Sequence, residues 1–134
     1  MALAQAGALI IDAARPDVYV VRVSGTFDRS TANRLVRLVG ARVRLAALGY
    51  ANTRHILVDL AHVAEAQTGA LDLLRNARRS AGKAGVTLHL TGCGAAIAAL
   101  GLSERQALVE LPAYPDVAVA LREFAGVDDP SCHR

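Results

Sequence analysis

RHILVDL, residues 54–60, is a compact apolar run with a single carboxylate near its end. A strand that is apolar on both sides is typical of the centre of a parallel sheet covered by helices. The segment that follows, residues 68–84, changes to helical spacing and predicts a helix. The residues expected on its inner face are Leu71, Leu74, Ala77 and Ala81.

The chain before this strand shows the same change of period. Residues 7–13 and 18–24 are apolar, and the second is rich in β-branched side chains, so both are predicted to be strands. Arg15-Pro16-Asp17 between them is typical of a hairpin turn. Residues 30–48 then repeat apolar side chains every three or four positions and predict the first helix.

The chain after the second helix is predicted in shorter pieces. Residues 86–91 alternate like a strand, residues 95–100 fit a short helix, and residues 108–111 fit a last short strand. Pro115 is expected to open the final helix, where its missing N–H costs nothing. The inner face of that helix is predicted to carry Val117, Ala120, Leu121 and Phe124.

Strands that alternate with helices predict an α/β fold with right-handed crossovers. We expect a mixed, mostly parallel sheet of four to five strands, with helices packed mainly on one face. The 134 residues suit a single domain spanning 1–134. Its core is expected over about 7–125, and the polar residues 126–134 are expected to form a flexible tail.

Composition argues against several classes of partner. Fourteen of the fifteen basic residues are Arg, but they are dispersed along the predicted helices, and there is no Trp to stack on bases, so no direct nucleic-acid binding is expected. No apolar run approaches the roughly 18 residues of a membrane span. No basic residue precedes Arg15, as a signal peptide would require. We therefore expect a cytoplasmic location and no membrane partner.

Signatures of metal sites and enzymes are missing from the sequence. Cys93 and Cys132 lie too far apart for a zinc or redox pair, and His55, His62 and His89 are interpreted as isolated structural or surface residues. There is no GxSxG, Walker A or HExxH motif. An enzyme would have to rely on carboxylates and one hydroxyl without a His at useful spacing, so we expect no enzyme, no cofactor and no metal. These residues are Asp28, Asp59, Glu65 and Thr68.

Two loops carry the candidate site. In the first, GTFDRSTA over residues 25–32, either Asp28 or Ser30 can cap the following helix. The second leaves the central strand after Asp59 and enters the next helix at Thr68. A hydroxyl at a helix start can cap the helix, or it can accept a phosphate, because the first-turn amides and the helix dipole favour a dianion.

Motifs in these loops and further along the chain agree with one known family. A G-x-x-D-x-x-T-A motif matches Gly25, Asp28, Thr31 and Ala32. A strand ending in D-L-S-x-V matches Asp59, Leu60 and Val63, with Ala61 in place of Ser. Later matches are Ala81, Gly85, Leu88, Leu90, Gly92, Gly101 and Leu102. In these features the chain resembles the STAS family, typified by antagonists of bacterial anti-sigma factors.

The resemblance implies a protein-binding regulatory module. The family's D-S-S-G or D-S-T-G box falls on Gln67, Thr68, Gly69 and Ala70, so Gln67 stands where the family carries Asp. Thr68 occupies the position of the regulated hydroxyl and is the candidate phosphoacceptor. The residues that the resemblance places at the partner surface are Asp28, Thr31, Gln67, Gly69 and Asp72.

The resemblance implies that the partner is an anti-sigma factor or a GHKL-type serine/threonine kinase. When the module binds this partner, the sigma factor is released. Two alternatives remain open from the residues. Thr68 can be a cap in a module that is never switched, or the loops around Asp28 and Thr68 can bind a small ligand such as a nucleotide, anion or lipid. The sequence is compatible with a monomer or an oligomer.

Overall fold

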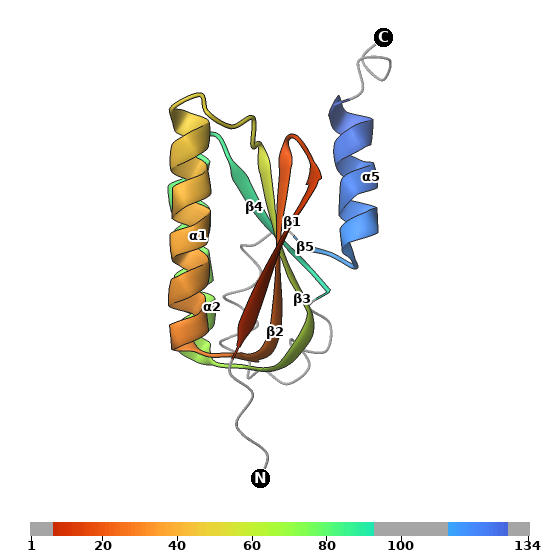
Figure 1. Cartoon of the computed structure of the whole chain (residues 1–134). Coiled ribbons are helices and arrows are strands. Elements are labelled where there is room, and N and C mark those ends of the chain that lie inside the picture. Colours follow the sequence, from red (N-terminus) through yellow and green to blue (C-terminus); the bar gives the residue numbers. More distant parts are fainter. Residues whose placement is uncertain (1–6, 93–112, 129–134) are drawn as a thin grey trace.

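The computed structural model describes residues 7–92 and 113–128, and it contains one five-stranded sheet in the order β1-β2-β3-β4-β5 (Figure 1). The strands are β1 (Ala8–Arg15), β2 (Val18–Phe27), β3 (His55–Ala66), β4 (Thr87–Thr91) and β5 (Ala113–Tyr114). β1 pairs antiparallel with β2, and every other pairing is parallel. The predicted mixed, mostly parallel α/β sheet is confirmed.

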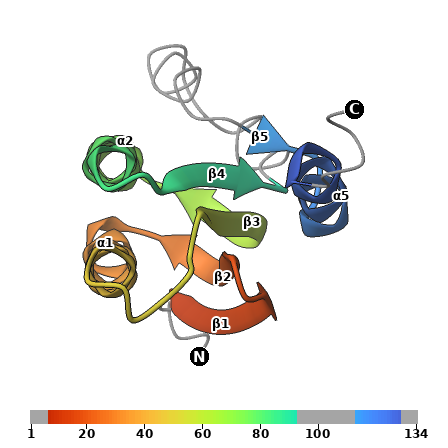
Figure 2. The same cartoon turned by 90° about the horizontal axis from the view of Figure 1, so that it is seen from above.

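Helices cover both faces of the sheet unequally. Figure 2 shows α1 (Arg29–Ala47) and α2 (Thr68–Lys83) side by side on one face, while α5 (Val117–Asp128) lies on the other. β3 is the central strand, as its apolar run predicts, and it is covered from both sides. The prediction that the two long helices share one face is confirmed.

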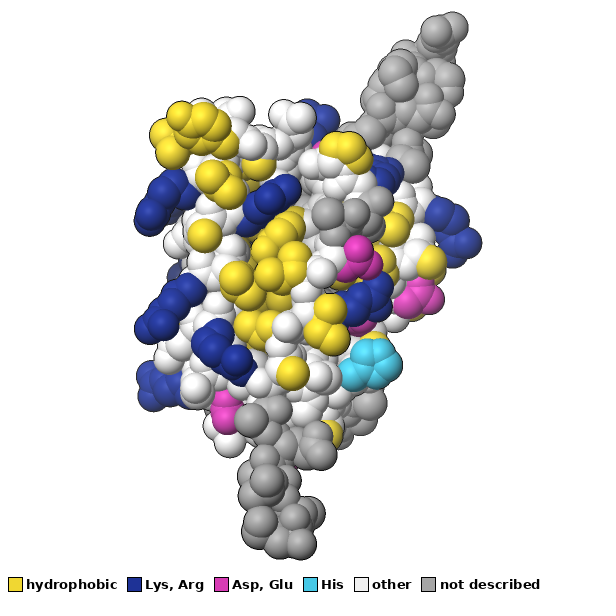
Figure 3. Space-filling model, viewed as in Figure 1, with side chains coloured by type: hydrophobic (Ala, Val, Ile, Leu, Met, Phe, Trp, Pro, Cys, Tyr) yellow, Lys and Arg dark blue, Asp and Glu magenta, His cyan; other side chains and the backbone are white. Residues whose placement is uncertain are grey.

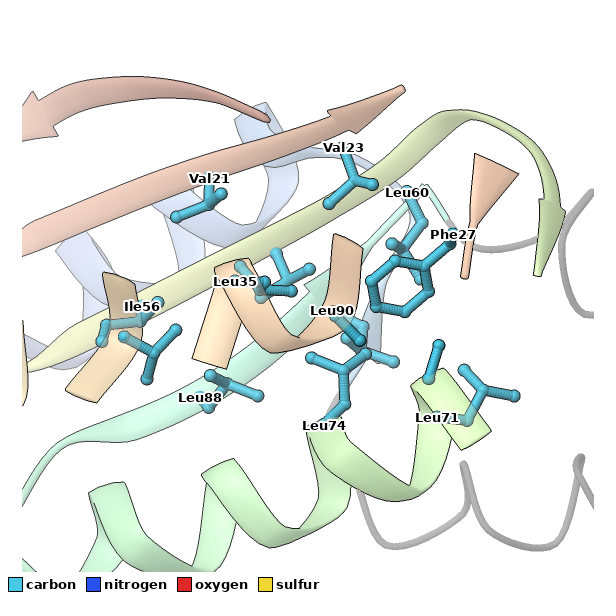
Figure 4. Close-up of a cluster of buried hydrophobic side chains, with 14 of the residues drawn as sticks. Val21, Val23, Phe27, Leu35, Ile56, Leu60, Leu71, Leu74, Leu88 and Leu90 are labelled. Carbon is cyan, nitrogen blue, oxygen red and sulfur yellow. The ribbon is translucent and has the colours of Figure 1, made fainter. Parts of the chain in front are cut away.

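The main core lies between the sheet and the α1–α2 layer (Figure 4). Side chains of alternate residues on β2, β3 and β4 meet the helical stripes that the sequence predicts, and all are buried. The large members labelled in the figure include Phe27, Leu35, Ile56, Leu74 and Leu88. This core fixes α1 and α2 on the sheet and therefore fixes where both helices begin.

A smaller core on the opposite face includes a pair of histidines. His55 stacks on Phe124 of α5 with ring centroids 3.9 Å apart, and its Nδ1 lies 3.2 Å from Nε2 of His89. The interpretation of these histidines as isolated is wrong, because β3 and β4 are parallel neighbours. Burial, and then the nearby charges of His55 and Arg78, lower the pKa of His89 to about 4, so this ring is neutral at neutral pH.

β2 and β3 extend further than the sequence predicts. Gly25 does not end β2, because its φ of +78° allows an irregularity, after which pairing with β3 resumes. Residues 61–66 continue β3 along this extension, where a loop is predicted. Val63 is buried in the extension, whereas Ala64 and Glu65 are both exposed, so the strict alternation of a strand is interrupted here, where the register with β2 shifts.

The C-terminal predictions are tested only in part. α5 begins at Val117, two residues after Pro115, and Asp116 accepts a hydrogen bond of 2.8 Å from the amide of Val119. A side-chain cap therefore sets the start of the helix. Strand β5 is not predicted from the sequence. Both cysteines, the predicted helix over 95–100, the predicted strand over 108–111 and most of the tail lie outside the described residues.

Candidate partner-binding site

The two loops of the candidate site meet at one edge of the sheet. β2 and β3 are parallel neighbours, and their last paired residues are Phe27 and Ala66. The amide of Gln67 donates to the carbonyl of Phe27 at 3.0 Å, so the pairing continues to the start of α2. As Figure 1 shows, α1 and α2 consequently begin beside each other at the same end of the molecule.

Asp28 is the N-cap of α1. Its backbone is extended, and its Oδ1 accepts a hydrogen bond of 2.8 Å from the amide of Thr31. This is the arrangement by which a carboxylate satisfies a free amide of the first turn. Hydrogen bonding from Thr31, with a smaller contribution from the nearby Arg34 charge, holds the pKa of Asp28 below its usual value. Of the two predicted candidates, Asp28 and Ser30, the carboxylate is the cap.

Thr31 lies inside the molecule, with an exposed fraction of 2%. Its hydroxyl donates to the carbonyl of Thr26 at 3.4 Å. It also packs against Gly7 so closely that a Cβ on Gly7 would overlap the Thr31 hydroxyl oxygen. The sequence prediction of Thr31 as a partner contact is therefore corrected: the side chain holds the loop that carries Asp28 and has almost no surface to offer.

α2 begins without a side-chain cap. Gln67 is its N-cap residue, with an extended backbone and no capping hydrogen bond from its side chain. The amides of Ala70 and Leu71 donate to the Gln67 carbonyl, at 3.1 and 3.4 Å. Thr68 is the first helical residue, so it is Gln67 and not Thr68 that occupies the cap position. The Gln67 side chain is exposed to solvent.

The first turn of α2 lies beside the first residue of α1. A Cβ placed on Gly69 would lie 4.0 Å from both Cδ and Nε of Arg29, the exposed first residue of α1. Neither helix has an acidic residue in its first turn. Asp72 follows on α2, is 53% exposed and lies 3.6 Å from Arg75. An exposed pair of this kind contributes little stability, so Asp72 is available at the surface.

Arg29 is a residue that the sequence analysis missed. Only its position directly after Asp28 could have signalled it, and that signal does not show which neighbouring loop it faces. Arg29 places a positive charge beside Gly69, at the end of the molecule where both helices begin. Amides and dipoles at helix starts stabilise negative charge, and a guanidinium adds to that field.

The carboxylate of Asp59 in β3 has an internal function. Asp59 is 4% exposed and accepts hydrogen bonds from the Thr91 hydroxyl at 3.1 Å and the Ala61 amide at 3.2 Å. Its second oxygen lies 3.3 Å from Arg22. A buried carboxylate is stable only when it is satisfied in this way. No cluster of three metal-ligating side chains is found among residues 7–92 and 113–128.

Comparison with known families agrees with this geometry. The model of the STAS domain matches residues 10–120, which is most of the chain. The chain belongs to the STAS domain family. Both loops and both helix starts lie within the matched residues, so the candidate site is part of the STAS fold.

Several solved structures share this STAS fold. An anti-sigma factor antagonist from Mycobacterium paratuberculosis has a TM-score of 0.65 and 22% identity, with 92% of this chain and 97% of that chain covered. The antagonist SpoIIAA in its unphosphorylated form has a TM-score of 0.63 and 10% identity, covering 89% and 97%. Bacillus SpoIIAA in its phosphorylated form has a TM-score of 0.59 and 11% identity, covering 86% and 98%. At these identities the likeness establishes the fold.

No curated protein matches the sequence. Among the helices that the structure describes, none is both long and apolar enough to cross a membrane.

Proposed function

We propose that this STAS domain is a non-enzymatic, cytoplasmic anti-sigma factor antagonist that binds an anti-sigma factor or a GHKL-type serine/threonine kinase and so frees a sigma factor. The observation that carries the proposal is the juxtaposition of the two helix starts at one sheet edge. Structural neighbours that are themselves anti-sigma factor antagonists support it. The partner would contact Asp28, Arg29, Gln67, Gly69 and Asp72.

Thr68 is the proposed phosphoacceptor of this surface. It is the first residue of α2, and the adjoining Gln67 does not use its side chain to cap the helix. A phosphate would add a charge of about −1.5 to −2 beside first-turn amides that have no carboxylate partner. The charge would be tolerated by the free domain and repelled by a partner surface adapted to a neutral hydroxyl. Phosphorylation would therefore release the partner.

A small-ligand sensor is the second function that the sequence leaves open. It would be favoured by a pocket shared by the loops around Asp28 and Thr68. The apolar cavity that the structure describes instead runs along α1 and α2, away from these loops. The protein-binding proposal is therefore the one that the geometry supports better.

The test combines binding and phosphorylation with one purified GHKL kinase from the same organism. We expect the parent and Thr68→Ser to bind alike, and Thr68→Asp to bind about tenfold more weakly, since one charge is introduced at the contact. Thr87→Asp is the matched control, because Thr87 is exposed at the opposite end of the strands. Intact mass after incubation with kinase and ATP should rise by one phosphate, and Thr68→Ala should prevent it.

Each outcome separates the alternatives. Binding without a phosphate would leave a constitutive antagonist, in which Gln67 has removed the switch. A phosphate that persists in Thr68→Ala would assign the acceptor to another residue. Equal affinities of the parent and a variant carrying both Asp72→Arg and Gln67→Arg would contradict the proposed surface altogether.

A further inference from the structure

A groove runs between α1 and α2 on the side of the helices away from the sheet. Its volume is about 240 Å³. Its floor is apolar and buried, as at Val39, Ala77 and Ala81, whereas Gly40 and Ser80 at its rim are exposed. The lining residues are Val36, Val39, Gly40 and Val43 of α1, and Leu73, Asn76, Ala77, Ser80 and Ala81 of α2.

The groove exists because small residues occupy the facing positions of the two helices. A Cβ added to Gly40 would meet nothing within 4 Å, so the space beside it is open. Ala77, Ser80 and Ala81 on α2 are too short to fill it from the other side. The apolar surface of the groove is therefore left in contact with water. Covering this surface with another structural element would be favourable.

The helices that form the groove are strongly basic. α1 contains five Arg and no acidic residue, and α2 contains three Arg and one Lys against one Asp. The chain as a whole has a net charge of only +3, so positive charge is concentrated in this layer. Figure 3 shows the dark blue side chains repeated along α1, with few acidic side chains beside them. Arg37, Arg44, Arg79 and Lys83 are exposed on the two helices.

We propose that this groove binds an amphipathic helix of a partner protein, with an apolar stripe that enters the groove and acidic residues on both sides of the stripe. A third helix can seat its ridge between two others at the usual interaxial distance of about 8–10 Å. The acidic flanks would lie against the Arg and Lys side chains and fix the choice of partner.

Other occupants fit the groove less well. A second copy of this chain, docked through the same face, would bring two basic layers together. A bilayer surface is flat and cannot fill a concave groove, and a nucleic acid backbone has no apolar ridge to insert. The proposal is independent of the anti-sigma function, because the groove lies along the helices and the candidate site lies at their first residues.

The test uses a synthetic helical peptide with Leu at positions i, i+3, i+4 and i+7 and Glu elsewhere, titrated into the full chain labelled with ¹⁵N. We expect backbone shifts on α1 and α2 and none on α5. Two matched peptides serve as controls: one with Lys for each Glu, expected to bind about tenfold more weakly, and one with the same composition in scrambled order, expected not to bind.

Variants of the chain locate the binding. Gly40→Leu fills the groove and should weaken binding of the Glu peptide about tenfold, a loss typical of a blocked apolar contact. Arg37→Glu combined with Arg44→Glu should do the same while leaving the groove open. Arg122→Glu on the exposed side of α5 is the control and should change nothing. Thr68→Asp should also leave peptide binding unchanged, which separates this surface from the candidate partner-binding site.

Several results would overturn the proposal. They are failure of the Glu peptide to bind, equal binding of the scrambled or Lys peptide, shifts that map to α5, or full affinity in Gly40→Leu. Vesicles of anionic phospholipid are added as a further arm. Binding to them that survives Gly40→Leu, in the absence of peptide binding, would assign the basic layer to a membrane surface instead.

Discussion

Helices α1 and α2 begin beside each other at one edge of the sheet, but they begin in different ways. At α1 the carboxylate of Asp28 accepts the Thr31 amide at 2.8 Å, and the buried Thr31 hydroxyl is tied to the preceding strand. At α2 the side chain of Gln67 makes no capping bond, and Gly69 follows in the first turn. The α1 start is held by side-chain hydrogen bonds, whereas the N-cap residue of α2 makes no side-chain capping bond.

The two helix starts would therefore have different roles at the proposed partner surface. A rigid start at α1 would present Asp28 and Arg29 in one geometry. The α2 start has no side-chain cap and carries a Gly, which suits a segment that changes its charge when Thr68 is modified. Substitutions at Asp28 and Gln67 test this asymmetry.

Removing the cap of α1 should have the largest effect. Asp28→Ala is expected to lower Tm by about 3–6 °C, the usual consequence of losing one good N-cap in a domain of this size. Gln67→Ala should leave Tm almost unchanged, because no capping bond is lost. Thermal unfolding followed by circular dichroism measures both. A similar decrease in the two variants would mean that Gln67 caps α2 in solution and that the asymmetry is absent.

Supplying the missing cap at α2 should have a smaller effect of opposite sign. Gln67→Asp is expected to raise the free energy of unfolding by about 0.5–1 kcal/mol, since Asp accepts a first-turn amide and suits the helix dipole. Urea denaturation gives the value, and hydrogen exchange of the Ala70 and Leu71 amides should slow together with it. If the extra stability comes without slower exchange at these amides, it arises elsewhere than in the cap.

The layout of the fold was largely predictable, because helical and strand periods report which face is buried. Residues 68–84 and 30–48 show a single apolar stripe each, and the structure places both on the predicted face. The extensions of β2 and β3 were not predictable in this way. A Gly such as Gly25 is read as the end of a strand, whereas here its positive φ lets the strand continue after an irregularity.

The candidate site was predictable at the level of loops and less so at the level of side chains. Parallel strands place successive loops at one edge, so the meeting of Asp28 and Gln67 follows from topology. The burial of Thr31 depends on Gly7, which is distant in sequence. The pairing of His55 with His89 depends on the register of two strands. Neither contact leaves a periodic signal in the chain.

Replacing the glycine in the first turn of α2 should stabilise that helix. Gly69→Ala is expected to raise the free energy of unfolding by about 0.5 kcal/mol, because Ala loses less backbone entropy in a helix. The nearest atoms to the new Cβ belong to Arg29, at 4.0 Å, so there is room for it. Gly40→Ala, in the middle of α1, is the matched control. Its Cβ also meets open space, so its free energy of unfolding should rise as well. A decrease in Gly69→Ala alone would indicate that the α2 start needs the freedom of Gly.

The smallest expected effect is a pH dependence that belongs to α1 alone. The pKa of Asp28 is lowered in the folded state by its hydrogen bond from Thr31, so the ionised carboxylate stabilises the fold above the unfolded pKa of about 3.9. That contribution is lost as the pH falls through the lower, folded-state pKa. Asp28→Asn caps nearly as well but cannot ionise.

We therefore expect Tm of the parent to exceed that of Asp28→Asn slightly at neutral pH, and the difference to shrink below about pH 4, where the carboxylate of the parent becomes protonated. Gln67→Asn is the control, because neither side chain ionises and its Tm difference from the parent should not change with pH. The measurement is a series of thermal melts from neutral to acidic pH on all three chains. A difference between the parent and Asp28→Asn that stays constant, or grows, as the pH falls would show that the charge of Asp28 does not stabilise the start of α1, and the contrast with α2 would then rest on hydrogen-bond geometry alone.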